Sequence, residues 1–240
     1  MSPASTAPPA LDASAPQGPK APRVLLIGDS MVVAELGRDM SRTLERVFAA
    51  EVHRRGKSSS GLARPDFFDW FSEGARLAEL HQPDVVVVII GGNDGQDLVN
   101  EEGRGRIRWR TEAWPEAYAS RVHRFLDAMA SEGRRFVWVE LPAMDHRRLE
   151  GKLQLIRPVQ QQALRDRSDV LGQVDTQACF YDKKGQLRQV IPEGPKKGRA
   201  LRQEDGIHFS LFGARWVSRC LTPQLIELVE RQVPPVDDRG

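Results

Sequence analysis

The 240-residue sequence has little cysteine and no long apolar run, and each shortage excludes a class of protein. Its two cysteines, Cys179 and Cys220, have neither zinc-ligand spacing nor the Cys-x-x-Cys spacing of a redox pair, and two cysteines do not define a disulfide framework. They are either unpaired core residues or one bridge formed in an oxidising compartment. Because no stretch of about 18 apolar residues occurs, we expect no membrane span in this sequence.

The sequence also lacks the features of a nucleic-acid or nucleotide-binding protein. Its 35 Lys and Arg against 33 Asp and Glu leave a formal charge of +2, whereas proteins that track phosphates usually carry a much larger excess. The basic clusters at 104–110 and 196–199 are therefore interpreted as solvated loops, and no nucleic-acid partner is expected. A flavodoxin-like nucleotide binder is disfavoured because neither a Gly-x-Gly-x-x-Gly nor a Walker loop occurs.

The composition predicts one folded domain between two unstructured ends. Residues 1–22 are rich in Ala, Pro and Ser and have neither the basic nor the apolar region of a signal peptide, so we predict a disordered linker there. Residues 23–233 have enough apolar content for one core, and 234–240 are predicted to be a flexible tail. Such linkers often tether exported domains to an upstream anchor. We therefore expect an exported protein of the periplasm or cell envelope, whose anchor was removed before Met1.

The apolar pattern alternates between short strands and amphipathic helices. Strands are predicted at 23–27, 49–53, 84–90, 135–140 and 172–175. The first helix is predicted after Ser30, because Leu36, Met40, Leu44 and Val47 form one apolar stripe. Further helices are predicted at 67–81, 114–132, 152–167 and 212–233. The segments 96–111 and 176–204 are predicted loop excursions, the second with room for a hairpin. The β-branched run at 84–90 is typical of a strand covered on both faces.

This alternation predicts an α/β fold, a three-layer α/β/α sandwich with a flavodoxin-like, doubly wound parallel sheet of about five strands. Ligands of such sheets lie outside the carboxyl ends of the strands. Ser30 follows the first predicted strand, Gly61 follows the second and Asn93 follows the third. We therefore expect these three residues at one edge of the sheet.

Ser30 has the position that a nucleophilic serine requires. Acyl transfer needs an exposed hydroxyl at a sharp turn, a histidine base, a carboxylate that orients the base, and donors for the oxyanion. Ser30 follows Gly28 and Asp29 at a strand-to-helix turn, where the helix N-terminus supplies free N–H groups. The alternative interpretation is that Asp29 and Ser30 only cap the helix.

His208 lies three residues after Asp205, just before the last predicted helix. A turn over this spacing brings the carboxylate beside the imidazole, where it fixes the tautomer and supports the imidazolium. The alternative is an Asx-type turn with His208 in a capping or packing role. Asn93 offers an amide for an oxyanion, although Asn and Gly are also common turn formers. Asp29 and Asp94 are predicted to shape their turns.

Taken together, these segments resemble the four conserved-sequence blocks of the SGNH/GDSL hydrolase superfamily. The matches are Gly28 to Ser30, Ser60 with Gly61, Gly91 to Asp94, and Asp205 to His208, within a resemblance that spans 24–228. The resemblance implies a serine esterase with a Ser30, His208 and Asp205 triad and an acyl-serine intermediate. It implies an oxyanion hole from the N–H groups of Ser30 and Gly61 and the amide of Asn93, with no metal and no cofactor.

The resemblance also suggests a substrate. Exported bacterial members often handle O-acetyl groups on cell-wall or exopolysaccharide glycans, so we expect an acylated carbohydrate or a small ester. Trp109 and Trp114 are candidates to stack on sugar rings, unless they only anchor a long loop. The same site would serve an O-acyltransferase working with a membrane acyltransferase partner. A non-catalytic glycan-binding or assembly subunit on this scaffold is the remaining alternative.

Overall fold

The structure is a computed structural model, which describes residues 21–100 and 103–232. The predicted linker at 1–22, except for Ala21 and Pro22, and the predicted tail at 234–240 lie outside these residues. The carbonyl of Pro22 accepts the N–H of Glu51 at 2.9 Å, so the chain is already joined to the sheet at this residue.

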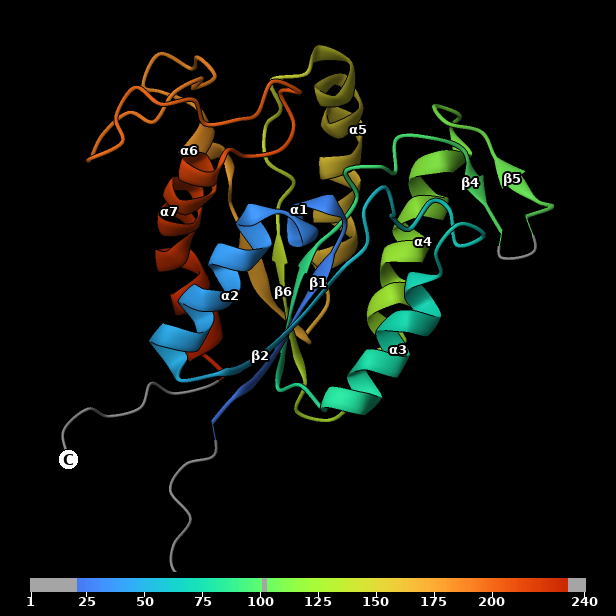
Figure 1. The fold of residues 1–240 in the computed structure, drawn as a ribbon. Coiled ribbons are helices and arrows are strands. Elements are labelled where there is room, and N and C mark those ends of the chain that lie inside the picture. Colours follow the sequence, from blue (N-terminus) through green and yellow to red (C-terminus); the bar gives the residue numbers. More distant parts are fainter. Residues whose placement is uncertain (1–20, 101–102, 233–240) are drawn as a thin grey trace, which may run out of the picture.

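A parallel five-stranded sheet forms the centre of the molecule (Figure 1). Its strands are β1 (Arg23–Gly28), β2 (Glu51–Gly56), β3 (Val85–Ile89), β6 (Arg135–Val139) and β7 (Val170–Val174). The spatial order is β2-β1-β3-β6-β7, and every neighbouring pair is parallel. The predicted fold class and the flavodoxin-like strand order are thereby confirmed.

The burial of each strand follows from its place in the sheet. β3 consists of four valines and an isoleucine, all buried, because it lies between β1 and β6 and is covered on both faces. β2 lies at one edge and exposes most of its charged side chains. The most buried strands are therefore β1, β3 and β6, which form the centre of the core.

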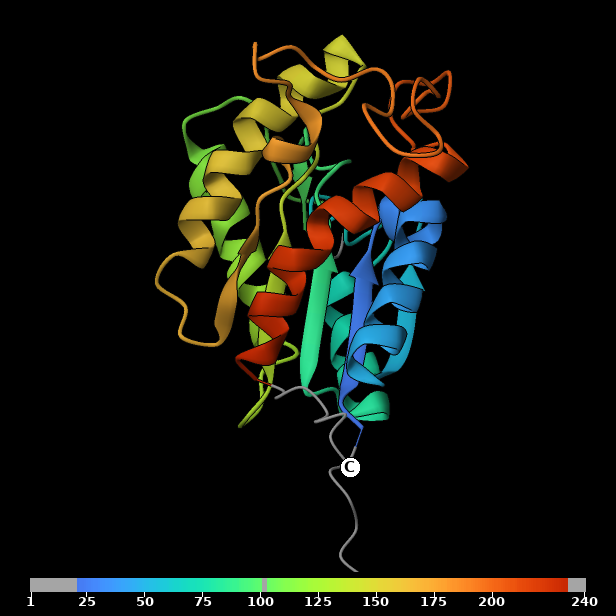
Figure 2. The same ribbon diagram turned by 90° about the vertical axis from the view of Figure 1, so that its left-hand side faces the viewer.

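Helices cover both faces of the sheet (Figures 1 and 2). The long ones are α2 (Glu35–Phe48), α3 (Trp70–His81), α4 (Ala113–Asp127), α5 (Arg147–Leu164) and α7 (Leu211–Glu230). Two short ones are α1 (Ser30–Val33) and α6 (Gln177–Phe180). α2 and α7 pack together on one face, and α3, α4 and α5 lie on the other. None of the helices in the described ranges has the length and apolar character needed to cross a bilayer.

Two predictions about the helices were wrong, one about a buried face and one about where a helix begins. Val47 was placed on the buried stripe of α2, but its side chain is 37% exposed and Phe48 is buried in its place. The predicted helix from residue 67 begins at Trp70, because the carboxylate of Asp69 accepts the N–H groups of Phe71 and Ser72 and caps the helix there. Phe67 lies before that cap and is 52% exposed.

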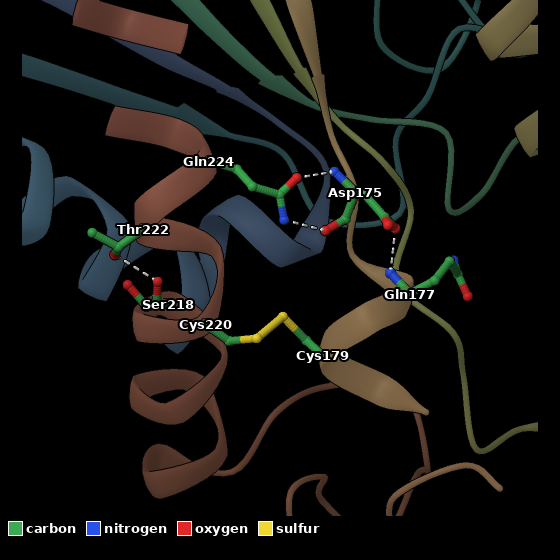
Figure 3. The surroundings of a disulfide bond; sticks show 7 residues. All are labelled: Asp175, Gln177, Cys179, Ser218, Cys220, Thr222 and Gln224. Atoms are coloured by element: carbon green, nitrogen blue, oxygen red, sulfur yellow. Dashed lines mark hydrogen bonds between the residues drawn. A yellow bond between two sulfur atoms is a disulfide. The ribbon is translucent and has the colours of Figure 1, made fainter. Parts of the chain in front are cut away.

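The two predicted excursions contain short elements. In the first, β4 (Leu98–Val99) and β5 (Arg106–Ile107) pair as an antiparallel hairpin that the sequence pattern did not predict. The second contains α6, followed by isolated bridges such as that between Val190 and Ala200. Cys179 in α6 and Cys220 in α7 form a disulfide (Figure 3). Of the two alternatives that the sequence left open, unpaired core cysteines or one bridge, the structure has the bridge.

Candidate active site

The loops after β1, β2 and β3 meet at one edge of the sheet. Gly28, at the end of β1, pairs with Gly56 on one side and with Ile89 on the other, so the three strands end side by side. A Cβ on Gly28 would lie 1.8 Å from the carbonyl oxygen of Ile89. Only glycine therefore permits this close approach, which fixes where the chain turns toward Ser30.

Ser30 is the first residue of α1 and is partly exposed. The Asp29 carboxylate caps this helix by accepting the N–H of Met31 at 3.0 Å, and its other oxygen accepts the N–H of Gly92 at 3.0 Å. Asp29 thus shapes its turn, as predicted, and also joins the first loop to the third. The N–H of Ser30 has no hydrogen-bond acceptor among the residues described, so it is free to bind an oxyanion.

Asp29 lies in an unusual electrostatic environment for a carboxylate. Burial raises its pKa to about 6, although the N–H groups of Met31 and Gly92 and the charge of His208 act to lower it. The segment bearing His208 lies on the same edge of the sheet as Ser30, because the N–H of Asp145, in the loop after β6, donates to the carbonyl of Gly206 at 2.9 Å.

Gly61 provides a second unpaired backbone donor. Its N–H has no acceptor within the described part of the chain, while the next two N–H groups, those of Leu62 and Ala63, donate to the Asp94 carboxylate at 3.0 and 2.8 Å. A Cβ on Gly61 would lie 2.0 Å from Oδ1 of Asp94. The absence of a side chain thus lets Asp94 fix the loop that presents the Gly61 N–H.

The amide of Asn93 is oriented by the same loop. Its Nδ2 donates to the carbonyl of Ser60 at 2.9 Å, which uses one of its two N–H bonds and leaves the other for a ligand. Asn93 is partly exposed, whereas the Asp94 side chain beside it is fully buried. Three candidate oxyanion donors therefore come from three loops that hydrogen-bond to one another.

A buried polar chain supports these loops from below, and the sequence analysis missed it. Tyr118 on α4 donates to Asp94 Oδ2 at 2.8 Å, and Gln160 on α5 donates to the Tyr118 oxygen at 3.0 Å and to the Ile90 carbonyl at 2.9 Å. Burial raises the pKa of Asp94 and, well above its usual value, that of Tyr118. The signal that could have revealed this chain is a glutamine among the apolar residues of α5, on a buried face that it shares with Arg157.

Asp205 and His208 form the side-chain pair that their spacing predicts. Nδ1 of His208 lies 2.7 Å from Oδ2 of Asp205, while Oδ1 of Asp205 accepts the N–H groups of Ile207 and His208. Burial acts to raise the pKa of Asp205, but these hydrogen bonds outweigh it and the pKa is lowered. An ionised Asp205 places the imidazole proton on Nδ1, which leaves Nε2 free to act as a base.

Arg202, which the sequence analysis also missed, supports the His208 segment from behind. Its guanidinium is buried between the rings of Phe180 and Phe209, with its central carbon 5.1 and 4.4 Å from their centroids. It donates to the carbonyl of Ile207 at 2.5 Å and to that of Ala143 in the loop after β6. Burial lowers the pKa of Arg202 to about 10, so the group remains a cation at neutral pH.

The structure brings the catalytic candidates to one edge but does not join them all. In the described ranges, no hydrogen bond links the hydroxyl of Ser30 to the ring of His208. Both groups are partly exposed, and neither the Ser30 hydroxyl nor Nε2 of His208 has another partner among residues 21–100 and 103–232. No group of three or more His, Cys, Asp or Glu side chains suited to a metal ion occurs in the part of the chain described.

The two predicted sugar-stacking residues lie differently in the structure. Trp114 is 2% exposed, stacks on Tyr118 at 4.7 Å and donates its ring N–H to the carbonyl of Gln96. It therefore has no free face for a sugar, and its role is to anchor the loop after Asp94. Trp109 packs edge-on against Trp114 at 4.5 Å but stays partly exposed and lines a polar hollow with Lys152. Its role in binding stays a prediction.

The parallel α/β/α fold, with Ser30 at the first strand end and the oxyanion candidates at the next two, is the fold of solved SGNH/GDSL hydrolases. The chain belongs to the family described as Protein of unknown function (DUF459), which matches residues 23–224. No curated protein matches the sequence significantly.

Solved structures share this fold at low sequence identity. A G-D-S-L family lipolytic protein from Desulfitobacterium hafniense is 13% identical, with a TM-score of 0.58 and coverage of 84% of this chain and 98% of that one. A protein described as an SGNH hydrolase from Slackia heliotrinireducens is 20% identical, with a TM-score of 0.57 and coverage of 86% and 100%. An acetylxylan esterase mutant from Geobacillus stearothermophilus is 15% identical, with a TM-score of 0.56 and coverage of 91% and 97%.

Proposed function

We propose that this protein is a serine esterase that hydrolyses O-acyl esters, with Ser30 as nucleophile, His208 as general base and Asp205 as its partner. The observation that carries the proposal is the pair of unpaired N–H groups, those of Ser30 and Gly61, at the strand end where the Ser30 hydroxyl is also free. An unpaired backbone N–H is unfavourable unless a ligand uses it. An oxyanion is the ligand that would use both.

The proposed reaction follows from the positions of these groups. Nε2 of His208 takes the proton of Ser30 as the hydroxyl oxygen attacks the ester carbonyl, and the imidazolium is stabilised by Asp205, 2.7 Å from Nδ1. The negative charge that forms on the carbonyl oxygen is bound by the N–H groups of Ser30 and Gly61 and by Nδ2 of Asn93. The C–O bond to the alcohol then breaks, and the alcohol leaves with the proton held by His208, so that an acyl-serine remains. Water, deprotonated by His208, attacks this ester, the carboxylic acid leaves and Ser30 regains its proton. Closure of the His208 segment onto Ser30 is part of the proposal, because catalytic hydrogen bonds are often looser without substrate.

The proposed substrate is an O-acetyl ester on a cell-wall or exopolysaccharide glycan, and the proposed location is the bacterial cell envelope. The esterase found among the structural neighbours acts on acetylxylan, which supports a carbohydrate substrate. The Cys179–Cys220 disulfide supports an oxidising compartment outside the cytosol. Release of free acetate at the same rate with and without a glycan acceptor would support hydrolysis over transfer to a sugar hydroxyl.

The proposal is tested by turnover of p-nitrophenyl acetate by the wild type and by Ser30→Ala. We expect Ser30→Ala to lose at least about a thousandfold in kcat, because no hydroxyl remains to form the acyl-enzyme. Ser58→Ala, in the exposed part of the loop after β2, is the matched control and should keep full turnover. Equal rates for Ser30→Ala and the wild type would exclude the proposed mechanism.

A further inference from the structure

Four arginines that the proposed mechanism does not use surround one hollow between α2 and α7. Arg42 and Arg46 project from α2, Arg215 and Arg219 from α7, and Asp39 is the one carboxylate that lines the hollow with them. We call this feature the arginine cleft. The two helices pack side by side in both views (Figures 1 and 2), and Thr43 meets Ser218 across them at 3.4 Å between hydroxyl oxygens.

The cleft keeps an excess of positive charge, because Asp39 is the one carboxylate that lines it beside four arginines. All four arginines are exposed, and none forms an ion pair with any carboxylate of the described chain. Other exposed arginines do find partners, as Arg38 does with Glu35 on the same helix α2. Because guanidinium groups stay charged at any physiological pH, four around one hollow create a positive potential that favours an anion.

An aromatic hollow adjoins the cleft. Arg215 and Arg219 line both, and the second hollow adds Phe212 and Trp216 from α7 and the strap formed by 191–196. Trp216 is partly exposed. Guanidinium groups beside a partly exposed ring suit a ligand that carries both anionic groups and flat apolar faces, as acidic sugars do.

The arginine cleft leads toward the candidate active site along α7. This helix begins at Leu211, three residues after His208, and Arg215 and Arg219 follow one and two turns later. At 1.5 Å per residue they lie about 6 and 12 Å along the helix from its first residue. A short chain of linked sugars bound in the cleft would therefore extend toward His208.

We propose that the arginine cleft binds the anionic groups, carboxylate or phosphate, of the acylated glycan, so that the substrate is an acidic polysaccharide. The inference rests on the proposed esterase function, because it assigns the substrate class of that site. A nucleic-acid ligand fits less well, because the whole chain has a formal charge of only +2, whereas proteins that track phosphates usually carry a much larger excess of positive charge.

The test measures binding of four probes to the full chain: galacturonate oligomers, short polyphosphate, neutral xylo-oligosaccharides and a single-stranded oligonucleotide. The variant Arg215→Gln/Arg219→Gln is compared with Arg165→Gln/Arg231→Gln, which loses the same charge at exposed sites outside the cleft. We expect the cleft variant to bind galacturonate or polyphosphate roughly tenfold more weakly than the control variant, and added salt to reduce the difference. Whichever of these two probes binds more tightly identifies the anionic group.

Equal affinities of the two variants, or equally tight binding of the neutral oligosaccharide, would overturn the inference. Tightest binding of the oligonucleotide would replace the glycan by a nucleic acid and would overturn it as well. The esterase proposal is scored separately, by p-nitrophenyl acetate turnover of the wild type. If turnover is present, acetylated polygalacturonate should be hydrolysed less well relative to p-nitrophenyl acetate by the cleft variant than by the control. An unchanged ratio would also count against the cleft.

Discussion

Asp29 links the turn that bears Ser30 to the loop that bears Asn93. Because its carboxylate is buried, keeping it ionised costs free energy. Its two N–H partners favour the ionised form, but desolvation outweighs them and raises the pKa to about 6. Since the folded-state pKa lies above the unfolded value of 3.8, protonation of Asp29 stabilises the fold. This contribution is complete below about pH 3.8 and is lost as the pH rises through about 6.

The wild type should therefore lose stability as the pH rises through about 6, because Asp29 becomes charged in a buried place. Asp29→Asn should remove this loss. The amide cannot take up a proton. When the pH is lowered from 8 to 5, the free energy of unfolding of the wild type should therefore rise by about 1.4 kcal/mol relative to that of the variant. Urea unfolding of both proteins at the two pH values measures the difference. A difference in the free energy of unfolding, wild type minus variant, that is equal at both pH values or smaller at pH 5 would contradict the assigned pKa.

At the residue scale, the sequence predicts what a local pattern encodes. Asp205 and His208 are three residues apart, so one turn determines their contact, and Ser30 is placed by the glycine and the helix start around it. Gln160 and Arg202 were not predictable, because their partners lie far along the chain at Ile90 and Ala143. A polar side chain in an apolar pattern indicates burial without identifying its partner.

At the element scale, the segment that bears Asp205 and His208 is neither helix nor strand, and Arg202 determines its position. The guanidinium joins the carbonyl of Ile207, within this segment, to that of Ala143 after β6. We therefore regard Arg202 as a positioning residue for His208. Loss of its contacts should displace the imidazole while the sheet remains intact.

Arg202→Met should lower kcat for p-nitrophenyl acetate by roughly ten- to a hundredfold, because misplacement of a catalytic group by about 1 Å has effects of this size. KM should change little, since Arg202 is buried and does not line the oxyanion site. Arg199→Met, at an exposed position three residues before Arg202, is the matched control. A folded Arg202→Met protein with wild-type kcat would remove this role.

Strands and helices differ in how well their limits could be predicted. The valine run of β3 is unambiguous, because only a strand with both faces covered needs it. The start of α3 depends on a single hydrogen-bonded cap at Asp69, and the β4–β5 hairpin has two residues per strand. Such features are too short for periodicity to reveal, so they needed coordinates.

At the scale of the whole molecule, the disulfide ties α6, which follows the last strand, to the closing helix α7. Near this bridge the side chain of Gln224 on α7 holds the backbone of Asp175 (Figure 3). Phe180, one residue after Cys179, covers the guanidinium of Arg202. The bridge thus secures the region that supports the His208 segment.

Cys179→Ala/Cys220→Ala should lower the free energy of unfolding by about 4 kcal/mol, because the 41-residue separation between the cysteines sets the loop entropy that the bridge removes from the unfolded chain. Urea unfolding of the variant and of the oxidised wild type measures the loss. Thiol titration of the unfolded wild type should detect no free cysteine. Two reactive thiols, or equal stabilities, would contradict the bridge.

The central claim is that distant segments bring an activated serine together with its base. Labelling by a fluorophosphonate, followed by mass spectrometry of the peptides, tests it most directly, since only a serine activated by a base reacts quickly. We expect one adduct, on Ser30, whose rate of formation falls at least about a hundredfold in His208→Gln. Labelling at another residue, or an equal rate in His208→Gln, would contradict it.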